Sequence, residues 1–131
     1  MLGYVYRFKN IRNEVIYVGY TNNIDRRMHE HFTRGHLPQP CYDSVAAIEY
    51  KQYNTKSDAA VMEIYYINTY QPIYNTRSKM HEPISLNIVD DDNWKVYMEM
   101  NPKPIKVSLW WFSPILFAVL LAIGIVLCLF L

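Results

Sequence analysis

Two short stretches near the start of the chain, residues 3–8 and 14–20, are rich in tyrosine, valine and phenylalanine. β-branched and aromatic residues favour strands, and the polar run 9–13 between the two stretches is typical of a hairpin loop. The pattern therefore predicts a β-hairpin. A third stretch of the same character, residues 44–53, predicts a third strand.

Between the second and third predicted strands, the spacing of the apolar residues changes. Ile24, Met28 and Phe32 recur every four residues, a spacing that places them on one face of a helix. The residues just before them, 21–23, are Thr-Asn-Asn, and side chains of these types cap helix N-termini. We therefore expect a helix over 24–34, with these three apolar residues as its inner stripe and a loop over 35–40.

A second helix is expected over residues 58–70. Capping residues lie at 54–58, and Pro72 ends the helical pattern. The order β-β-α-β-α predicts an α/β fold, in which helices flank a small three-stranded antiparallel sheet. We assign this domain to residues 1–80.

The rest of the chain divides into two parts. Residues 81–107 are rich in turn-forming residues and are interpreted as a linker or an extension of the domain. Residues 108–131 contain no charged side chain and are long enough to cross a bilayer as one helix. They predict a single-pass C-terminal membrane anchor. Lys103 and Lys106 precede this stretch and no charge follows it, so the N-terminal domain is expected on the cytoplasmic side.

Charge and cysteine content narrow the range of possible functions only slightly. Residues 1–81 contain ten Lys or Arg against seven Asp or Glu. This small positive excess is compatible with a polyanionic partner such as nucleic acid. The two cysteines, Cys41 and Cys128, do not have the spacing of a zinc-binding motif. A zinc site combining Cys41 with nearby histidines is disfavoured, because His29 and His31 point in opposite directions on a helix.

A set of residues in the predicted hairpin and helices resembles the motifs of one known family. The two strands contain the tripeptides Tyr4-Val5-Tyr6 and Tyr17-Val18-Gly19, and the further matching residues are Arg27, His31, Glu63 and Asn75. In this order and spacing, over residues 3–76, the chain resembles the GIY-YIG nucleases. It departs from the family name at Tyr4, where the first tripeptide has glycine.

The resemblance implies a role for each matching residue. Tyr6 would be, or would assist, the general base that activates water, and Tyr17 would orient the water or the phosphate. Arg27 would stabilise the phosphoryl charge, His31 would assist proton transfer, and Glu63 would bind Mg²⁺ or Mn²⁺. The remaining two positions, Gly19 and Asn75, would bind substrate or support the structure.

The residues themselves leave alternatives open. Arg27 and His31 lie at the edge of the predicted apolar stripe, whereas Arg26, His29 and Glu30 point away from it. Glu63 is the only charged residue between 58 and 77, on an apolar helix face. Burying a carboxylate is costly unless it has a cation or a hydrogen-bond partner. The partner is either a divalent metal or an arginine, such as Arg7 or Arg27.

Taken together, these features predict a membrane-anchored, metal-dependent endonuclease that hydrolyses phosphodiester bonds in nucleic acid. DNA is the expected substrate. The alternative is a catalytically inactive module, tethered to the membrane, that binds nucleic acid or docks a partner. The sequence predicts neither an oligomeric state nor a sequence specificity.

Overall fold

The computed structural model describes residues 1–76, 88 and 90–102. Over this part of the chain the elements are strands β1 (Gly3–Lys9) and β2 (Val15–Thr21), helices α1 (Ile24–Arg34) and α2 (Gln39–Ser44), strand β3 (Ala47–Tyr53), helix α3 (Lys56–Tyr70) and strand β4 (Lys95–Glu99). The prediction of a mixed α/β fold with an antiparallel sheet is confirmed.

The sheet has the strand order β2-β1-β3-β4, and every neighbouring pair is antiparallel. The prediction of three strands is therefore wrong. The additional strand, β4, lies within the segment 81–107 that was interpreted as a linker or extension. It is an edge strand in which only Tyr97 is half-buried, so it lacks the apolar alternation that marks a strand in the sequence.

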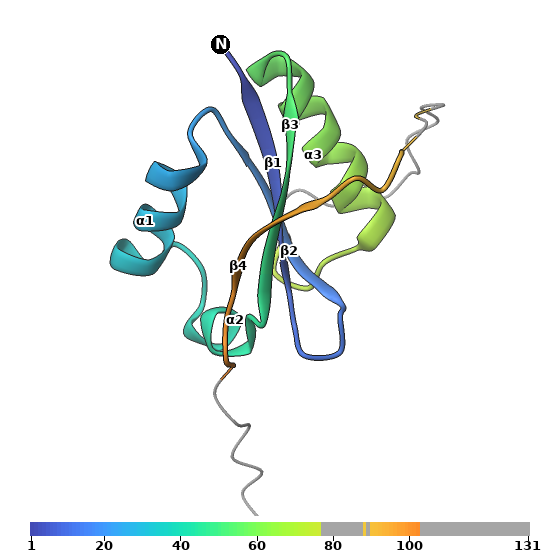
Figure 1. Cartoon of the computed structure of the whole chain (residues 1–131). Coiled ribbons are helices and arrows are strands. Elements are labelled where there is room, and N and C mark those ends of the chain that lie inside the picture. Colours follow the sequence, from blue (N-terminus) through green and yellow to red (C-terminus); the bar gives the residue numbers. More distant parts are fainter. Residues whose placement is uncertain (77–87, 89, 103–131) are drawn as a thin grey trace, which may run out of the picture.

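The helices cover both faces of the sheet, with α1 and α3 on opposite sides and α2 at the lower end of the α1 side (Figure 1). Each face has its own hydrophobic cluster. The cluster on the α1 side includes Tyr6, Phe8, Met28, Cys41, Val45 and Ile48. The cluster on the α3 side consists of Val5, Val18, Ala59, Tyr66 and Ile67. The central strand β1 contributes to both clusters, since successive side chains point to opposite faces.

The short helix α2 is a second difference from the prediction. It occupies residues that were expected to form the end of a loop and the start of the third strand. Pro40 lies in its first turn, where proline is tolerated because the N–H groups there have no partner within the helix. As a result, β3 begins only at Ala47.

Strand β4 and the residue before it, Trp94, contact the helices or side chains on both faces of the sheet. On the α3 side, the guanidinium carbon of Arg7 lies 4.1 Å from the ring centre of Trp94. On the α1 side, the Tyr97 hydroxyl donates a 2.8 Å hydrogen bond to Asp25 at the start of α1. The segment therefore packs as part of the domain.

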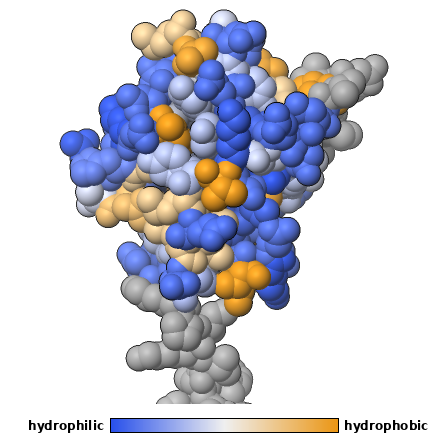
Figure 2. Space-filling model, in the orientation of Figure 1, coloured by the Kyte–Doolittle hydropathy of each residue, from blue (hydrophilic) through white to orange (hydrophobic). Residues whose placement is uncertain are grey.

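The surface seen in the orientation of Figure 1 is mainly hydrophilic, with several hydrophobic side chains among the polar ones (Figure 2). Among the helices of the described residues, none is long and apolar enough to cross a membrane. The predicted anchor, residues 108–131, lies outside the described residues.

Candidate active site

The pairing of β1 with β2 determines which tyrosines share a face of the sheet. Tyr6 lies opposite Gly19, and Phe8 lies opposite Tyr17. Since side chains alternate along a strand, Tyr6, Tyr17 and Gly19 are on the same face. The rings of Tyr6 and Tyr17 are 6.1 Å apart between centroids. The hairpin register, which the sequence left open, thus brings the two motif tyrosines together.

Gly19 makes room for the Tyr6 hydroxyl. A Cβ atom at position 19 would lie 2.5 Å from the Tyr6 Oη, which is far closer than two such atoms can approach. The ring of Tyr6 is fully buried and its hydroxyl is hydrogen-bonded, so it cannot easily move aside. Glycine is therefore required here because of the close approach, and the structure gives Gly19 a steric role.

Helix α1 supplies the two polar residues that contact Tyr6. The Arg27 Nε donates to the Tyr6 Oη at 3.2 Å, and the His31 Nε2 lies 2.8 Å from the same oxygen. The predicted inner stripe is partly wrong, since Phe32 is 41% exposed whereas His31 is only 1% exposed. The helix is rotated so that His31 is buried against the sheet, while Phe32 lies at the edge of the interface, with its ring stacked on Phe8.

His31 connects Tyr6 to a further tyrosine. Its Nδ1 is 3.1 Å from the Tyr42 hydroxyl, which also accepts a hydrogen bond from the Leu37 N–H. Burial, with the nearby charge of Arg27, lowers the pKa of His31 to about 4, so its ring is neutral at pH 7. Both neutral tautomers of His31 satisfy these contacts. With the proton on Nδ1, the Tyr6 hydroxyl donates to Nε2 and the Nδ1–H donates to Tyr42, and with the proton on Nε2 both directions reverse.

The pKa values of the two tyrosines do not favour a preformed phenolate. Burial raises the pKa of Tyr6 well above 10, although Arg27 acts in the opposite direction. Burial also raises the pKa of Tyr17, and the Glu63 carboxylate adds to this rise. Arg27 alone does not lower the phenol pKa enough for Tyr6 to lose its proton near pH 7.

Glu63 approaches the same site from α3, at the outer edge of the sheet. Its carboxylate accepts a hydrogen bond from the backbone N–H of Tyr20 on the edge strand β2. Burial raises the pKa of Glu63 to about 7, despite this hydrogen bond and the charge of Arg27. The carboxylate is close enough to Tyr17 to raise the pKa of that phenol, and close enough to Arg27 for the guanidinium to lower the pKa of Glu63.

Neither of the two arginines named as candidates forms a salt bridge with Glu63. Arg7 instead pairs with Glu49, with a 2.7 Å contact, and Arg27 pairs with Glu30 at 3.2 Å. Within the described part of the chain, no Lys or Arg nitrogen lies within 4.0 Å of the Glu63 carboxylate. A half-buried carboxylate without an ion-pair partner is the kind of group that binds a divalent cation.

The Asn75 side chain forms hydrogen bonds with the free edge of β2. Its side-chain oxygen accepts from the Val18 N–H at 2.8 Å, and its side-chain nitrogen donates to the Val18 carbonyl at 2.7 Å. The amide thus replaces the neighbouring strand that an edge strand lacks. This contact holds the segment after α3 beside Tyr17 and Gly19, and it gives Asn75 a structural role.

Among the described residues, no three His, Cys, Asp or Glu side chains are grouped closely enough to hold a metal ion. Glu63 is the residue that the family resemblance assigns to metal binding. A single carboxylate suits Mg²⁺, because this ion keeps several water ligands and takes others from substrate phosphates.

Two supporting residues were not identified from the sequence. Glu30 was expected to point away, but it binds both Arg26 at 2.6 Å and Arg27 at 3.2 Å. Its spacing of three and four residues from these arginines was the available signal. Tyr42 lies on the unpredicted helix α2, and its contact with His31 had no signal in the sequence.

Comparison with known proteins agrees with this geometry. Residues 2–78 match the family described as the GIY-YIG catalytic domain. The chain is 33% identical over 78 residues to the UvrABC system protein C of Bacteroides thetaiotaomicron, a match that covers 57% of this chain and 13% of that protein. It is 32% identical over 76 residues to the UvrABC system protein C of Lacticaseibacillus casei, covering 56% and 13%. The match thus spans about an eighth of the length of these relatives. Because the family match covers more than half of the sequence, this chain belongs to the GIY-YIG family, with residues 2–78 as its catalytic domain.

Proposed function

We propose that this chain is a metal-dependent endonuclease that hydrolyses phosphodiester bonds in DNA. The observation that carries the proposal is the direct contact of Tyr6 with both Arg27 and His31, beside the carboxylate of Glu63. Hydrolysis of a phosphodiester needs a way to take a proton from water and a cation to neutralise the phosphate, and these residues provide both.

Arg27 is the group that stabilises charge on the phosphate. Its Nε binds Tyr6 and its Nη1 binds Glu30. Arg27 also forms a side-chain hydrogen bond with Tyr17. A guanidinium has five N–H donors, more than these contacts use, and the remaining ones can donate to a phosphoryl oxygen. The existing contacts fix the plane of the guanidinium, so little orientation is lost when the substrate binds.

Tyr6 and His31 form a proton relay. The Tyr6 oxygen takes a proton from the attacking water while the Tyr6 hydroxyl proton passes to the His31 Nε2. The raised pKa of Tyr6 and the lowered pKa of His31 both oppose complete charge separation before the reaction. The proton therefore moves as the water attacks, so that the phenol gains one proton as it loses another and stays neutral, while Arg27 stabilises the negative charge that develops at the phosphate.

Glu63 is the residue that would hold the cation. Its carboxylate lies at the edge of the site, is half-buried and has no arginine or lysine partner among the described residues. When bound, Mg²⁺ or Mn²⁺ would supply charge neutralisation at the phosphate and at the leaving oxygen. The backbone N–H of Tyr20 holds the carboxylate in place for this purpose.

The pKa of Glu63 predicts a metal-linked pH dependence. Because burial raises this pKa to about 7, the carboxyl is largely protonated below pH 7, and a cation competes with the proton. At limiting Mg²⁺ the cleavage rate should therefore increase as the pH rises from 6 to 8. The midpoint should move to lower pH as Mg²⁺ is raised. A profile whose midpoint is the same at low and high Mg²⁺ would contradict the assignment of Glu63 as the metal ligand.

We further propose that residues 108–131 anchor the nuclease domain to a membrane, with the domain on the cytoplasmic side. The support is the length and the uncharged composition of this stretch, together with the two lysines just before it. The full-length chain, expressed in bacteria, should remain in the membrane pellet after extraction with alkaline carbonate. A chain ending at residue 107 should be released, and release of the full-length chain under the same treatment would exclude the anchor.

A further inference from the structure

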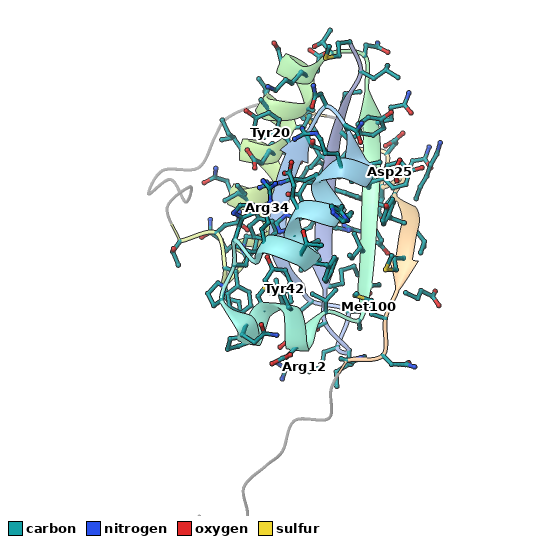
Figure 3. The ribbon with its side chains drawn as sticks, turned by 90° about the vertical axis from the view of Figure 1, so that its left-hand side faces the viewer. Arg12, Tyr20, Asp25, Arg34, Tyr42 and Met100 are labelled. Carbon is teal, nitrogen blue, oxygen red and sulfur yellow. The ribbon has the colours of Figure 1, made fainter. Side chains whose placement is uncertain are left out.

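An exposed aromatic residue lies directly beside the proposed metal ligand. Tyr20 follows Gly19 on the edge strand β2, and its backbone N–H binds the Glu63 carboxylate. Because side chains alternate, its ring is on the opposite face from Gly19, toward α3. The ring is 36% exposed, whereas the rings of Tyr6 and Tyr66 are fully buried. Figure 3 shows Tyr20 beside α3.

A lysine accompanies this ring. The Lys56 Nζ is 6.0 Å from the centre of the Tyr20 ring, at the first position of α3. Lys56 and Glu63 are seven residues apart on the helix, so they lie on nearly the same side and are separated by about 10 Å along its axis. Lys56 and Glu63 on α3, with the Tyr20 ring of β2 beside Lys56, therefore form a row that extends from the candidate active site.

We propose that Tyr20 stacks on an unpaired base and that Lys56 binds a neighbouring phosphate, so that the substrate is single-stranded or locally unpaired nucleic acid. This inference rests on the proposed nuclease function and specifies its substrate. An exposed ring offers a stacking surface that any base can use. In a continuous duplex the faces of the bases are already stacked on each other, and a ring at the strand edge cannot reach them. A lysine held near the ring adds the backbone contact that single-strand sites combine with stacking.

The test measures binding separately from cutting. A fluorescently labelled single-stranded oligonucleotide and the blunt duplex of the same sequence are titrated with the full-length chain, in calcium in place of magnesium. The parent should bind the single strand more tightly than the duplex. Tyr20→Ala should weaken binding of the single strand by about tenfold and hardly change duplex binding. Tyr20→Phe keeps the ring and should restore the single-strand preference.

The charge contact is tested with a matched pair of variants. Lys56→Ala should weaken binding of both probes. It should also reduce the slope of log affinity against log salt concentration by about one, which corresponds to one phosphate contact. Arg12→Ala is the control, because Arg12 is an exposed cation at the opposite end of the molecule from Tyr20 (Figure 3). Thermal unfolding of Tyr20→Ala must match the parent, so that a loss of binding is not a loss of structure.

The outcomes separate this inference from the function on which it rests. The inference is overturned if the duplex binds at least as tightly as the single strand, or if Tyr20→Ala affects both probes equally or neither. Cleavage in magnesium with no effect of Tyr20→Ala on strand preference would leave the nuclease function standing and reject the stacking site. Selective single-strand binding that depends on Tyr20, without any cleavage, would support the stacking site and reject the nuclease.

Discussion

Arg27→Ala is expected to lower the rate of DNA cleavage by about 10²- to 10³-fold, which is the usual cost of removing one group that stabilises charge in a transition state. The reason lies in its two contacts. In the proposed mechanism Arg27 neutralises the phosphate, and its Nε also donates to the Tyr6 oxygen and holds it in position for the proton transfer. Loss of the side chain removes both effects. The measurement is the single-turnover rate of the full-length chain on a labelled DNA substrate.

Two neighbouring variants make this result specific. Arg26→Ala removes an equally charged residue from the same helix, one that binds Glu30 from the exposed side. It should leave the rate within about twofold of the parent, since it loses only a surface ion pair. Arg27→Lys keeps the charge but loses the planar pair of donors, so its rate should fall between the parent and Arg27→Ala. Equal losses in Arg26→Ala and Arg27→Ala would mean that only net charge matters.

Glu63→Gln is expected to abolish metal-dependent cleavage without destabilising the protein. The amide has the same shape and can still accept the Tyr20 N–H, but it cannot provide the negative charge that binds Mg²⁺. Asp58→Asn is the matched control, because it neutralises an exposed carboxylate in the first turn of the same helix. Its cleavage rate should remain close to that of the parent.

Thermal stability provides a second measurement, which compares Glu63→Gln with the parent. The pKa of Glu63 is raised from 4.5 to about 7, so its contribution to stability is present below pH 4.5 and is lost as the pH rises through 7. Without a divalent cation at pH 8, Glu63→Gln should therefore unfold at a higher temperature than the parent. Mg²⁺ should raise the unfolding temperature of the parent and not that of Glu63→Gln. If Mg²⁺ stabilised both proteins equally, the ion would bind elsewhere.

The local chemistry of α1 explains why its position in the chain was predictable. Asn23 accepts a hydrogen bond from the Arg26 N–H at 2.9 Å and so caps the N-terminus. Gly35 ends the helix with a φ of 61°, a conformation that glycine adopts without strain. Both signals are local and visible in the sequence, and the observed bounds Ile24–Arg34 agree with the prediction.

The rotation of α1 was not predictable from the same pattern. An apolar stripe indicates that Phe32 is inside, because burying a histidine normally costs more than burying a phenylalanine. His31 is buried instead because Tyr6 and Tyr42 satisfy its two ring nitrogens. Both partners come from other elements, and Tyr42 belongs to a helix that the sequence did not reveal. Tertiary hydrogen bonds therefore determine which face of α1 forms the site.

The fourth strand illustrates the same limit for the fold. β4 is exposed along most of its length and is held by contacts to distant residues, such as the hydrogen bond from Tyr97 to Asp25. The spacing of apolar residues within the segment does not reveal these contacts. The hairpin and α3 were predictable because the strand-forming residues of the hairpin and the cap of α3 lie within each segment, as in the Thr55 hydroxyl that caps α3.

The most direct test of the central claim is DNA cleavage by the purified full-length chain, kept in a mild detergent because of its apolar C-terminal stretch. Plasmid and single-stranded DNA are incubated with Mg²⁺ or Mn²⁺, and in parallel with a chelator. We predict cleavage that requires the metal and is lost in Glu63→Gln. A folded chain that binds DNA but leaves it intact in both metals would contradict the account, and would identify the domain as a binding or docking module.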